Sequence, residues 1–435
     1  MNYLFEALFL MIFIFLALCV QSNRTAVRSI LIGVLVVYLF MYDYVNYYLG
    51  VISGTEIIIY KLGVEFILLS ALFKMFFSRK ISRPSFKYLM IVSLVVLISA
   101  IFGLVGGATA KSVYTDFRDI FSSIFLAILL VITSKNPEAE LSVFIKVFFV
   151  MATINGVVAV HEYITYTGNY ESLWRYQSLL DSKLRVNDSY NTGQLIYQIV
   201  RDDNLRASGF LISALIASYV YGFFLVKIIC DIIILKKKNN MMFNIFYFLL
   251  YLLFSYVTMV RTGVLMVVIA IVIILIFKLI SSDKLRKISA IIFSLSLVSL
   301  LFLYLSSDFE FSKDASSQGR LLQYVTFFND FTPLGRGLGS YPGAFDSYYI
   351  YTLLELGIGA IIFIFVLISL ATSVAKNDEA VSNQMNKRLR LCVLVQLAIF
   401  LFVCSFQHIA GSVYYTLLIL YIVYNSKLKY KTSVS

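Results

Sequence analysis

The sequence predicts an all-α, polytopic integral membrane protein with about 12–13 transmembrane helices in a single transmembrane domain, residues 1–435. Of the 435 residues 60% are hydrophobic and 14% are charged, and the mean hydropathy is +0.87. Apolar runs of about 18 residues or more, long enough to cross a bilayer as a helix, recur along the chain. They lack the alternating pattern of a membrane β-barrel, so helices are expected.

Thirteen apolar segments are predicted as helices. They lie at roughly 3–20, 29–42, 56–77, 88–105, 116–133, 142–165, 207–230, 243–260, 262–280, 288–306, 348–372, 391–408 and 411–425. Two long connections separate them, at 166–206 and 307–347. Connections of this length, between helices that need only short turns, are where binding or catalytic residues are expected.

Basic residues predict the orientation of these segments, because Lys and Arg accumulate on the cytoplasmic side of a membrane. The connections after the odd-numbered segments, with their helix ends, hold 24 of the 36 basic residues, including the run Lys236, Lys237 and Lys238. Both long connections therefore fall on the external side. The net charge of +12 is explained by this topology, and no nucleic-acid partner is needed.

Cysteine and glycine patterns exclude several classes of protein. Cys19, Cys230, Cys392 and Cys404 all lie in apolar segments or at their ends, which predicts buried thiols and no disulfide framework. No Cys/His cluster has metal-ligand spacing, and no nucleotide-binding glycine motif opens a soluble βαβ unit. We therefore expect no metal site and no cofactor.

Arginine is concentrated on the predicted external side. The external arginines are Arg118, Arg175, Arg185, Arg201, Arg206, Arg261, Arg320 and Arg336. Lysine is sufficient for topology, whereas the planar guanidinium grips a phosphate or carboxylate with two parallel hydrogen bonds. The external side is thus predicted to hold an anion. The alternative is that each Arg is a snorkelling or salt-bridged helix end, with acids such as Asp202 and Asp203 nearby.

The stretch from Gly319 to Gly359 combines charge, aromatic residues and backbone-bending residues between two apolar segments. It contains two of the four prolines, Pro333 and Pro342, and five glycines between Gly335 and Gly357. A loop with so many positions of special backbone geometry usually carries function.

Short motifs in this part of the chain resemble one bacterial family. They are RASG at 206–209, VRTG at 260–263, Arg320 with Tyr324, PLGRGLG at 333–339, DSYYI at 346–350 and ELG at 355–357. In this order, over roughly 200–365, they are similar to the O-antigen polymerase and O-antigen ligase superfamily. The ligase pattern has His-Asn where this chain has Asp346 and Ser347, which favours the polymerase.

The resemblance implies a glycosyltransferase of the bacterial inner membrane that acts on the periplasmic face. Its donor and acceptor would be undecaprenyl-diphosphate-linked oligosaccharides, which it would polymerise into the O-antigen polysaccharide of lipopolysaccharide. Its partners would be membrane lipid and a polysaccharide chain-length regulator. In a ligase the acceptor would instead be the lipid A core.

A glycosyl diphosphate already contains its leaving group, so catalysis needs positive charge on the departing diphosphate and a base for the acceptor hydroxyl. The predicted catalytic residues are Arg206, Arg261 and Arg320 for the first role and Asp346 for the second. The alternative for Asp346 is a helix N-cap of segment 348–372.

Further substrate-binding candidates surround these four. They are Arg336, Glu355, Tyr324, Gly337, Gly339, Tyr349, Glu162 and His161. Glu355 is expected to brace an arginine or to form a structural ion pair. His161 and Glu162 form either a second acid/base pair or a satisfied pair at the membrane interface. His408, between the last two segments, is interpreted as a turn residue.

The first long connection contains an amphipathic pattern. Leu173, Tyr176, Leu180 and Leu184 share one face of a predicted helix, which would lie on the outer membrane surface unless the stretch is an irregular loop. The aromatic residues Tyr166, Tyr170, Trp174 and Tyr176 either stack on sugar rings or belong to the interfacial aromatic belt.

Two other classes of function stay open at this point. A lipid-linked oligosaccharide flippase or other transporter would carry charges in the middle of its helices, where this chain has few beyond Glu65 and Lys146. A structural assembly protein would explain the long loops and leave the external arginines unexplained.

Overall fold

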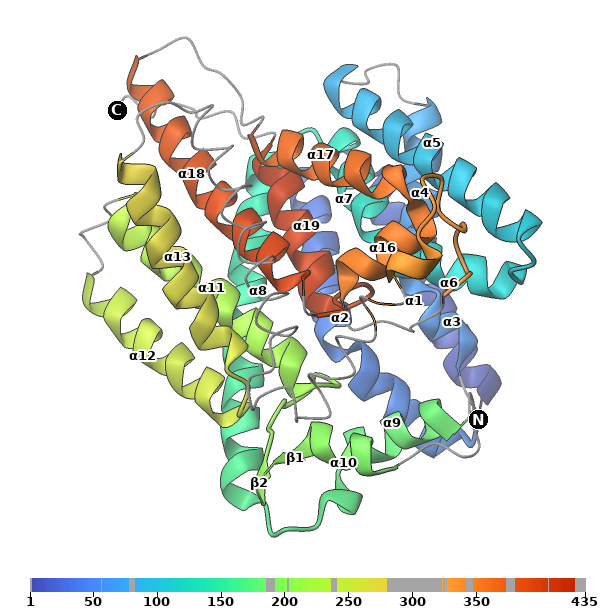
Figure 1. Cartoon of the computed structure of the whole chain (residues 1–435), viewed down its shortest axis with the longest axis vertical. Coiled ribbons are helices and arrows are strands. Elements are labelled where there is room, and N and C mark those ends of the chain that lie inside the picture. Colours follow the sequence, from blue (N-terminus) through green and yellow to red (C-terminus); the bar gives the residue numbers. More distant parts are fainter. Residues whose placement is uncertain are drawn as a thin grey trace. The chain divides into compact units, whose positions relative to one another are not determined.

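The computed structural model describes residues 2–55, 57–77, 83–184, 192–201, 203–235, 241–279, 323, 325, 327–341, 347–372, 380–405 and 407–426 (Figure 1). The chain divides into two compact units, each built from two stretches of sequence. Unit 1 comprises Met1–Ser78 and Thr133–Ile269, and unit 2 comprises Arg79–Ile132 and Ala270–Ser435. The predicted segment 288–306 lies outside the described residues.

Unit 1 is a helical bundle with short helices and a two-stranded sheet at one end. Its elements are α1 (Asn2–Gln21), α2 (Thr25–Ser53), α3 (Ile58–Lys61), α4 (Gly63–Phe77), α8 (Pro137–Thr165), the 3₁₀ turn η1 (Tyr170–Ser172), α9 (Trp174–Leu184), α10 (Thr192–Ile199), β1 (Val200–Arg201), β2 (Asn204–Leu205), α11 (Ala214–Ile233), α12 (Met241–Val257) and α13 (Thr262–Leu279), which crosses into unit 2. Strands β1 and β2 form an antiparallel pair with Val200 opposite Leu205. Helix α8 packs against α2, α11 and α12.

Unit 2 is also helical. Its described elements are α5 (Arg83–Val105), α6 (Ala110–Ile120), α7 (Ser122–Ile132), α16 (Tyr348–Leu356), α17 (Ile358–Thr372), α18 (Ala380–Val403) and α19 (Val413–Asn425). Helices α7 and α19 are buried along almost their whole lengths and pack on each other. Helices α16 and α17 meet at Gly357 with a bend of 120°.

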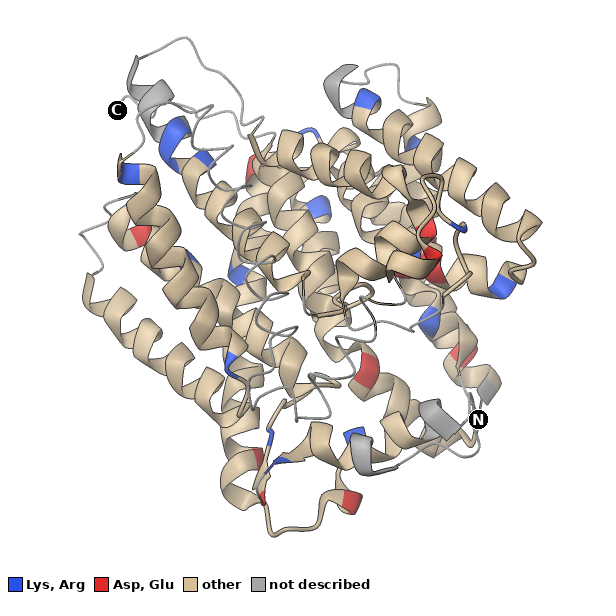
Figure 2. Cartoon of the chain, viewed as in Figure 1, with Lys and Arg blue, Asp and Glu red and all other residues tan. Residues whose placement is uncertain are grey.

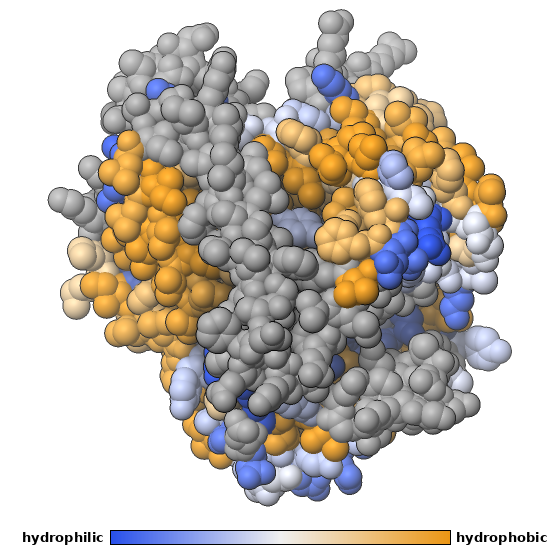
Figure 3. Space-filling view, viewed as in Figure 1, coloured by the Kyte–Doolittle hydropathy of each residue, from blue (hydrophilic) through white to orange (hydrophobic). Residues whose placement is uncertain are grey.

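The prediction of an all-α, multi-pass membrane protein is confirmed. Among the described residues six helices are long and apolar enough to cross a membrane, namely α1, α2, α5, α8, α11 and α13, and the bent pair α16/α17 is a seventh candidate. On α5 the apolar side chains Met90, Leu94, Leu97 and Ile101 are all exposed. Figure 3 shows such apolar surface in orange, and Figure 2 shows how sparsely charged residues are placed along the helices.

Three predicted segments are interrupted helices. Segment 56–77 contains α3 and α4 with a break at Leu62, and segment 348–372 contains α16 and α17 with the bend at Gly357. Segment 116–133 contains the last residues of α6, which begins at Ala110, and the whole of α7, with a break at Phe121. Helix α6 is preceded by Thr109, whose side chain caps the helix by accepting from the Ser112 amide. Helix α6 is more polar than α7, yet the hydropathy pattern placed its last residues in the same predicted segment as α7.

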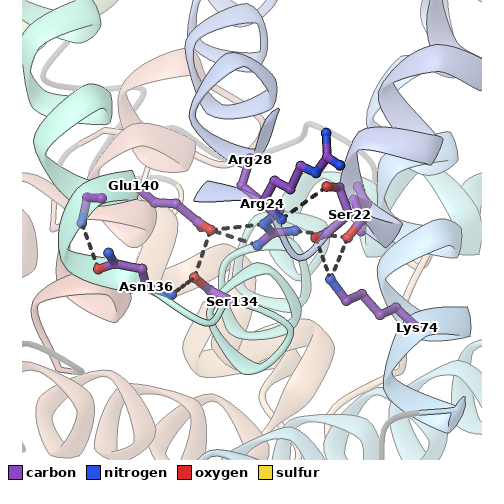
Figure 4. A network of polar contacts seen from close by, with 9 residues as sticks. Ser22, Arg24, Arg28, Lys74, Ser134, Asn136 and Glu140 are labelled. Atoms are coloured by element: carbon purple, nitrogen blue, oxygen red, sulfur yellow. Dashed lines mark hydrogen bonds and ion pairs between the residues drawn. The ribbon is translucent and has the colours of Figure 1, made fainter. Parts of the chain in front are cut away.

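A buried ion pair fastens one end of unit 1 (Figure 4). Arg28 on α2 donates from Nε and Nη2 to the two carboxylate oxygens of Glu140 on α8, at 2.9 and 3.2 Å. Ser134 donates to the same carboxylate at 2.7 Å, and Lys74 on α4 donates to the Ser22 carbonyl at 2.9 Å. The connections after the first, third and fifth predicted segments therefore meet at one end of unit 1.

The other end of α8 carries the first long connection. Glu140 and Glu162 are separated by about 33 Å along α8 at 1.5 Å per residue, which matches the hydrocarbon thickness of a bilayer. The connections after the first, third and fifth predicted segments and the 166–206 connection thus lie at opposite ends of α8.

Candidate functional site

The RASG turn at 206–209 is held on α8 by Asn155. The Asn155 side chain donates to the Ser208 carbonyl at 3.1 Å and accepts from the Phe210 amide at 2.8 Å. Gly209 has a φ of 64°, and a Cβ there would lie 2.7 Å from the Asn155 side-chain oxygen. The turn therefore requires glycine at this position, both for its backbone conformation and for its close approach to α8.

Glu162, near the end of α8, accepts from three donor groups. Its Oε2 accepts from Arg175 Nη1 at 2.9 Å and from the amides of Ser208 and Gly209 at 3.2 and 3.0 Å. The same Arg175 nitrogen donates to Ser208 Oγ at 2.7 Å. Glu162 is thus an ion-pair partner of Arg175, and this contact joins α8, α9 and the RASG turn.

Arg206 and Arg201 lie beside this ion pair. Both guanidinium groups lie near the ring of Tyr197, at 6.0 and 5.8 Å from its centre, and Arg206 Nη1 donates to the Tyr197 carbonyl at 3.2 Å. Burial lowers the pKa of Arg206, and the positive charges of Arg201 and Arg175 lower it further, against the opposing effect of Tyr197. The charges of Arg201 and Arg175 therefore both act on Arg206, while the Glu162 carboxylate pairs with Arg175.

Some donor groups of these arginines have no partner among the described residues. They are Nε and Nη2 of Arg175 and Nε of Arg206, all buried. Nε and Nη2 form one edge of the guanidinium, the edge with which Arg28 holds both oxygens of Glu140. Because a buried donor without an acceptor is costly, this edge of Arg175 is suited to an anion.

The predicted amphipathic helix in the 166–206 connection is present as α9. Tyr176 is buried in a cluster with Leu195, Ile199 and Leu205, and Leu173 and Leu180 pack against the same cluster. Trp174 is buried and meets Tyr44 edge to face at 5.3 Å. Tyr176 and Trp174 are therefore structural, and of the four aromatic candidates only Tyr166 and Tyr170 are half-buried.

In unit 2, residues 333–341 form a loop, called here the glycine loop, that lies against α5, α6 and α16. Gly335, Gly337 and Gly339 have φ angles of 71°, 90° and 86°. A Cβ on Gly337 would lie 1.9 Å from the Gly103 amide nitrogen, so the loop backbone touches the backbone of α5. The positive φ angles and the close approach explain why glycine stands at these positions.

Two buried carboxyl groups hold this loop. Asp116 on α6 is 1% exposed and accepts from the Gly339 amide at 2.7 Å and from the Tyr351 hydroxyl at 2.6 Å. Glu355 on α16 is 0% exposed and accepts from the Tyr341 amide at 3.2 Å.

Glu355 accepts from the Tyr341 amide and lies beside Asp116, and it forms no ion pair with an arginine among the described residues, which do not include Arg320. The capping alternative for Asp346 is wrong, because Ser347 is the N-cap of α16 and accepts from the Ile350 amide. Serine is among the best capping residues, and it stands directly before the helix.

Four other predicted site residues are exposed or make contacts within the fold. The Arg336 side chain is 48% exposed and pairs with Asp330 at 2.9 Å. The Tyr349 hydroxyl donates to the Leu401 carbonyl at 2.5 Å. Arg261 is exposed at the join between α12 and α13, and His161 is exposed on α8. The interpretation of His161 and Glu162 as a pair with each other is therefore replaced by the contact between Glu162 and Arg175.

The predicted site residues fall in both units. Arg206, Arg261, His161 and Glu162 lie in unit 1, and Arg336, Gly337, Gly339, Tyr349 and Glu355 lie in unit 2, while Arg320, Tyr324 and Asp346 lie outside the described residues. The structure adds Arg175 and Asp116. Arg175 is one of the external arginines, whereas Asp116 had a usable signal only in its position at the edge of an apolar segment.

No protein-family model, curated protein or solved structure matches the chain. Within the described part of the chain, no group of three His, Cys, Asp or Glu side chains is arranged to hold a metal ion. The arrangement around Arg175 and Arg206 is therefore interpreted from its own chemistry.

Proposed function

We propose that this protein is an O-antigen polymerase, a glycosyltransferase that uses undecaprenyl-diphosphate-linked oligosaccharides as both donor and acceptor. The observation that supports this proposal is the cluster of Arg175, Arg201 and Arg206, in which Nε and Nη2 of Arg175 and Nε of Arg206 are buried and have no acceptor among the described residues. A diphosphate carries at least two negative charges and many acceptor oxygens, so it matches such a cluster. The motif resemblance supplies the sugar chemistry.

In the proposed reaction an acceptor sugar hydroxyl attacks the anomeric carbon of the growing chain. The new bond joins the acceptor oxygen to that carbon, and the bond from the carbon to the diphosphate oxygen breaks. Arg206 and Arg175 stabilise the negative charge that develops on the leaving diphosphate. Asp346, assigned from the motif resemblance alone, accepts the proton of the hydroxyl.

Glu162 has a positioning role in this scheme. By accepting from Arg175, Ser208 and Gly209 it fixes the arginine to the turn that carries Arg206. Arg206 is half-buried, whereas Arg175 is 1% exposed. An arriving anion therefore meets Arg206 before it meets the more deeply buried Arg175.

The proposal includes a location and partners. The protein would lie in the bacterial inner membrane with the 166–206 and 307–347 connections on the periplasmic face. Its product would be long O-antigen chains for lipopolysaccharide biosynthesis, with a polysaccharide chain-length regulator as its protein partner. The arginine cluster at the end of α8 opposite the basic connections is consistent with this orientation.

Replacing Arg206 with Lys tests the proposal in cells. The charge is kept and the planar fork is lost, so polymerisation should fail while transport and ligation of single repeats continue. The expected gel shows lipid A core with one repeat unit in place of a ladder. The matched control is Arg24→Lys, which alters an exposed arginine at the other end of unit 1.

Two outcomes would overturn the proposal. A full ladder from Arg206→Lys at normal protein abundance would remove this residue from the mechanism. Complete loss of even the single repeat unit would favour a flippase or a ligase, since both are needed to place one unit on the lipid A core.

A further inference from the structure

The buried carboxyl groups of Asp116 and Glu355 pose a problem of charge. Glu355 lies beside Asp116 close enough for a side-chain hydrogen bond. Neither residue forms an ion pair with a basic side chain among the described residues. Two adjacent carboxylates that are 1% and 0% exposed cannot both keep a negative charge without a large free-energy cost.

The hydrogen-bond partners show where a proton belongs. Each oxygen of Asp116 already accepts from a donor, Oδ1 from the Tyr351 hydroxyl and Oδ2 from the Gly339 amide. Oε1 of Glu355 accepts from the Tyr341 amide. Oε2 of Glu355 is buried and has no donor among the described residues. The oxygen without a donor is the one suited to carry a hydrogen itself.

We propose that Glu355 is protonated at Oε2 and donates this hydrogen to Asp116, so that the two residues form a proton-binding site that fixes the glycine loop. One proton then satisfies the buried oxygen, leaves a single negative charge, and gives that charge on Asp116 three donors. The pair holds the loop through the amides of Gly339 and Tyr341.

The titratable groups that face the pair come from α6, α16, the glycine loop and the connection between α18 and α19. Arg118 on α6 acts on Asp119, and Arg336 on the loop pairs with Asp330. Tyr351 from α16 and Tyr341 from the loop act as donors, and Asp119 from α6 adds a further carboxyl group near Tyr351. His408, from the connection between α18 and α19, lies against the Tyr351 ring at 4.7 Å. Helix α5 contributes backbone, since the Leu338 amide donates to the Ser99 carbonyl.

Loss of the proton would place two negative charges side by side behind the glycine loop. The loop that carries Arg336 would then separate from α6 and α16 at alkaline pH. This inference does not rest on the proposed function, because it concerns protonation and loop order and is tested without any activity measurement.

Infrared spectroscopy of the purified full-length protein tests the protonation directly. The wild type at neutral pH, well above the reference Glu pKa of about 4.3, should show a protonated-carboxyl stretching band that moves in D₂O. Glu355→Gln should remove that band, and the control Asp330→Asn should retain it. Absence of the band in the wild type, or its persistence in Glu355→Gln, would overturn the proposal.

Amide hydrogen exchange of the glycine loop distinguishes the two acids. Gln at 355 keeps an acceptor for Tyr341 and a donor for Asp116, so loop protection should stay within about threefold of the wild type. Asn at 116 places its side-chain NH₂ group against either the Gly339 amide or the Tyr351 hydroxyl, both of which are donors. Loop protection should therefore fall by at least about tenfold. Equal effects of the two variants would contradict the assignment.

Three further measurements test the shared proton: the pH dependence of exchange, a second variant, and the effect of added cations. In the wild type, the exchange rate of the loop amides should rise with pH more steeply than the intrinsic exchange rate of an unstructured amide does. In Glu355→Gln the rise should follow the intrinsic rate alone. Should Glu355→Gln fail to fold, Tyr351→Phe removes one donor from Asp116 and should shift the wild-type infrared band. Loop protection that depends on added Na⁺ or K⁺ would show a cation between the carboxylates and refute the shared proton.

Discussion

Replacement of Arg175 with Lys separates anion binding from structural support at the proposed site. Arg175 Nη1 makes hydrogen bonds to Glu162 at 2.9 Å and to Ser208 at 2.7 Å, and its Nε and Nη2 have no partner among the described residues. A lysine ammonium keeps the charge and can retain the contact with Glu162. It cannot reproduce the two parallel donors of the other edge.

The two contributions have different magnitudes. If the free edge holds the departing diphosphate, its loss should cost about 3–4 kcal/mol in the transition state, which is roughly a hundred- to thousand-fold in rate. Loss of one hydrogen bond to a charged group should lower the free energy of unfolding by about 1.5–3 kcal/mol. The activity should thus fall steeply in a protein that still folds.

The assay is polymer formation by purified protein in lipid vesicles, with thermal unfolding measured on the same preparation. Glu162→Gln is the companion variant, because it loosens Arg175 and leaves the guanidinium intact. It should reduce the rate less than Arg175→Lys does. If folded Arg175→Lys polymerises at a rate within about threefold of the wild-type rate, the loss is under 1 kcal/mol, and Nε and Nη2 of Arg175 do not hold the diphosphate.

Three further predictions follow from the fold. Arg28→Ala should lower the free energy of unfolding by about 3–5 kcal/mol because it leaves Glu140 buried without its partner, and the double variant with Glu140→Gln should recover part of the loss in thermal unfolding. Cysteines placed at Ser178 and Ser316 should both be labelled from the periplasm, and labelling of only one would disprove a shared face. Polymerisation should continue in chelator, because arginines neutralise the diphosphate; a loss restored by Mg²⁺ or Mn²⁺ would contradict this.

The helical membrane class could be predicted from hydropathy because lipid contact imposes long apolar runs on the sequence. The positions where helices break were harder to predict from the sequence. The bend at Gly357 and the break at Phe121 depend on packing of α16 and α6 within unit 2, which apolar content does not encode. The glycine loop was recognised as special from its composition, and its contacts with α5 supply the reason.

The candidate site was only partly predictable, since its polar contacts join residues far apart in sequence. The sequence places Glu162 beside His161, yet its partner is Arg175 on another helix. No local pattern marks Asp116, because its role arises from contacts with Gly339 and Tyr351 on distant segments. In both cases the role of the acidic residue depends on contacts with residues far away in the sequence. The local sequence shows only where the acidic residue stands.

The measurement that tests the central claim most directly is a reconstitution of the purified protein in vesicles with undecaprenyl-diphosphate-linked oligosaccharide alone. The proposed polymerase should lengthen the oligosaccharide and release one undecaprenyl diphosphate for each new linkage, and Arg206→Lys should abolish both. Translocation of the unchanged lipid-linked oligosaccharide across the bilayer, with no new glycosidic bond, would contradict the proposed function and identify the protein as a transporter.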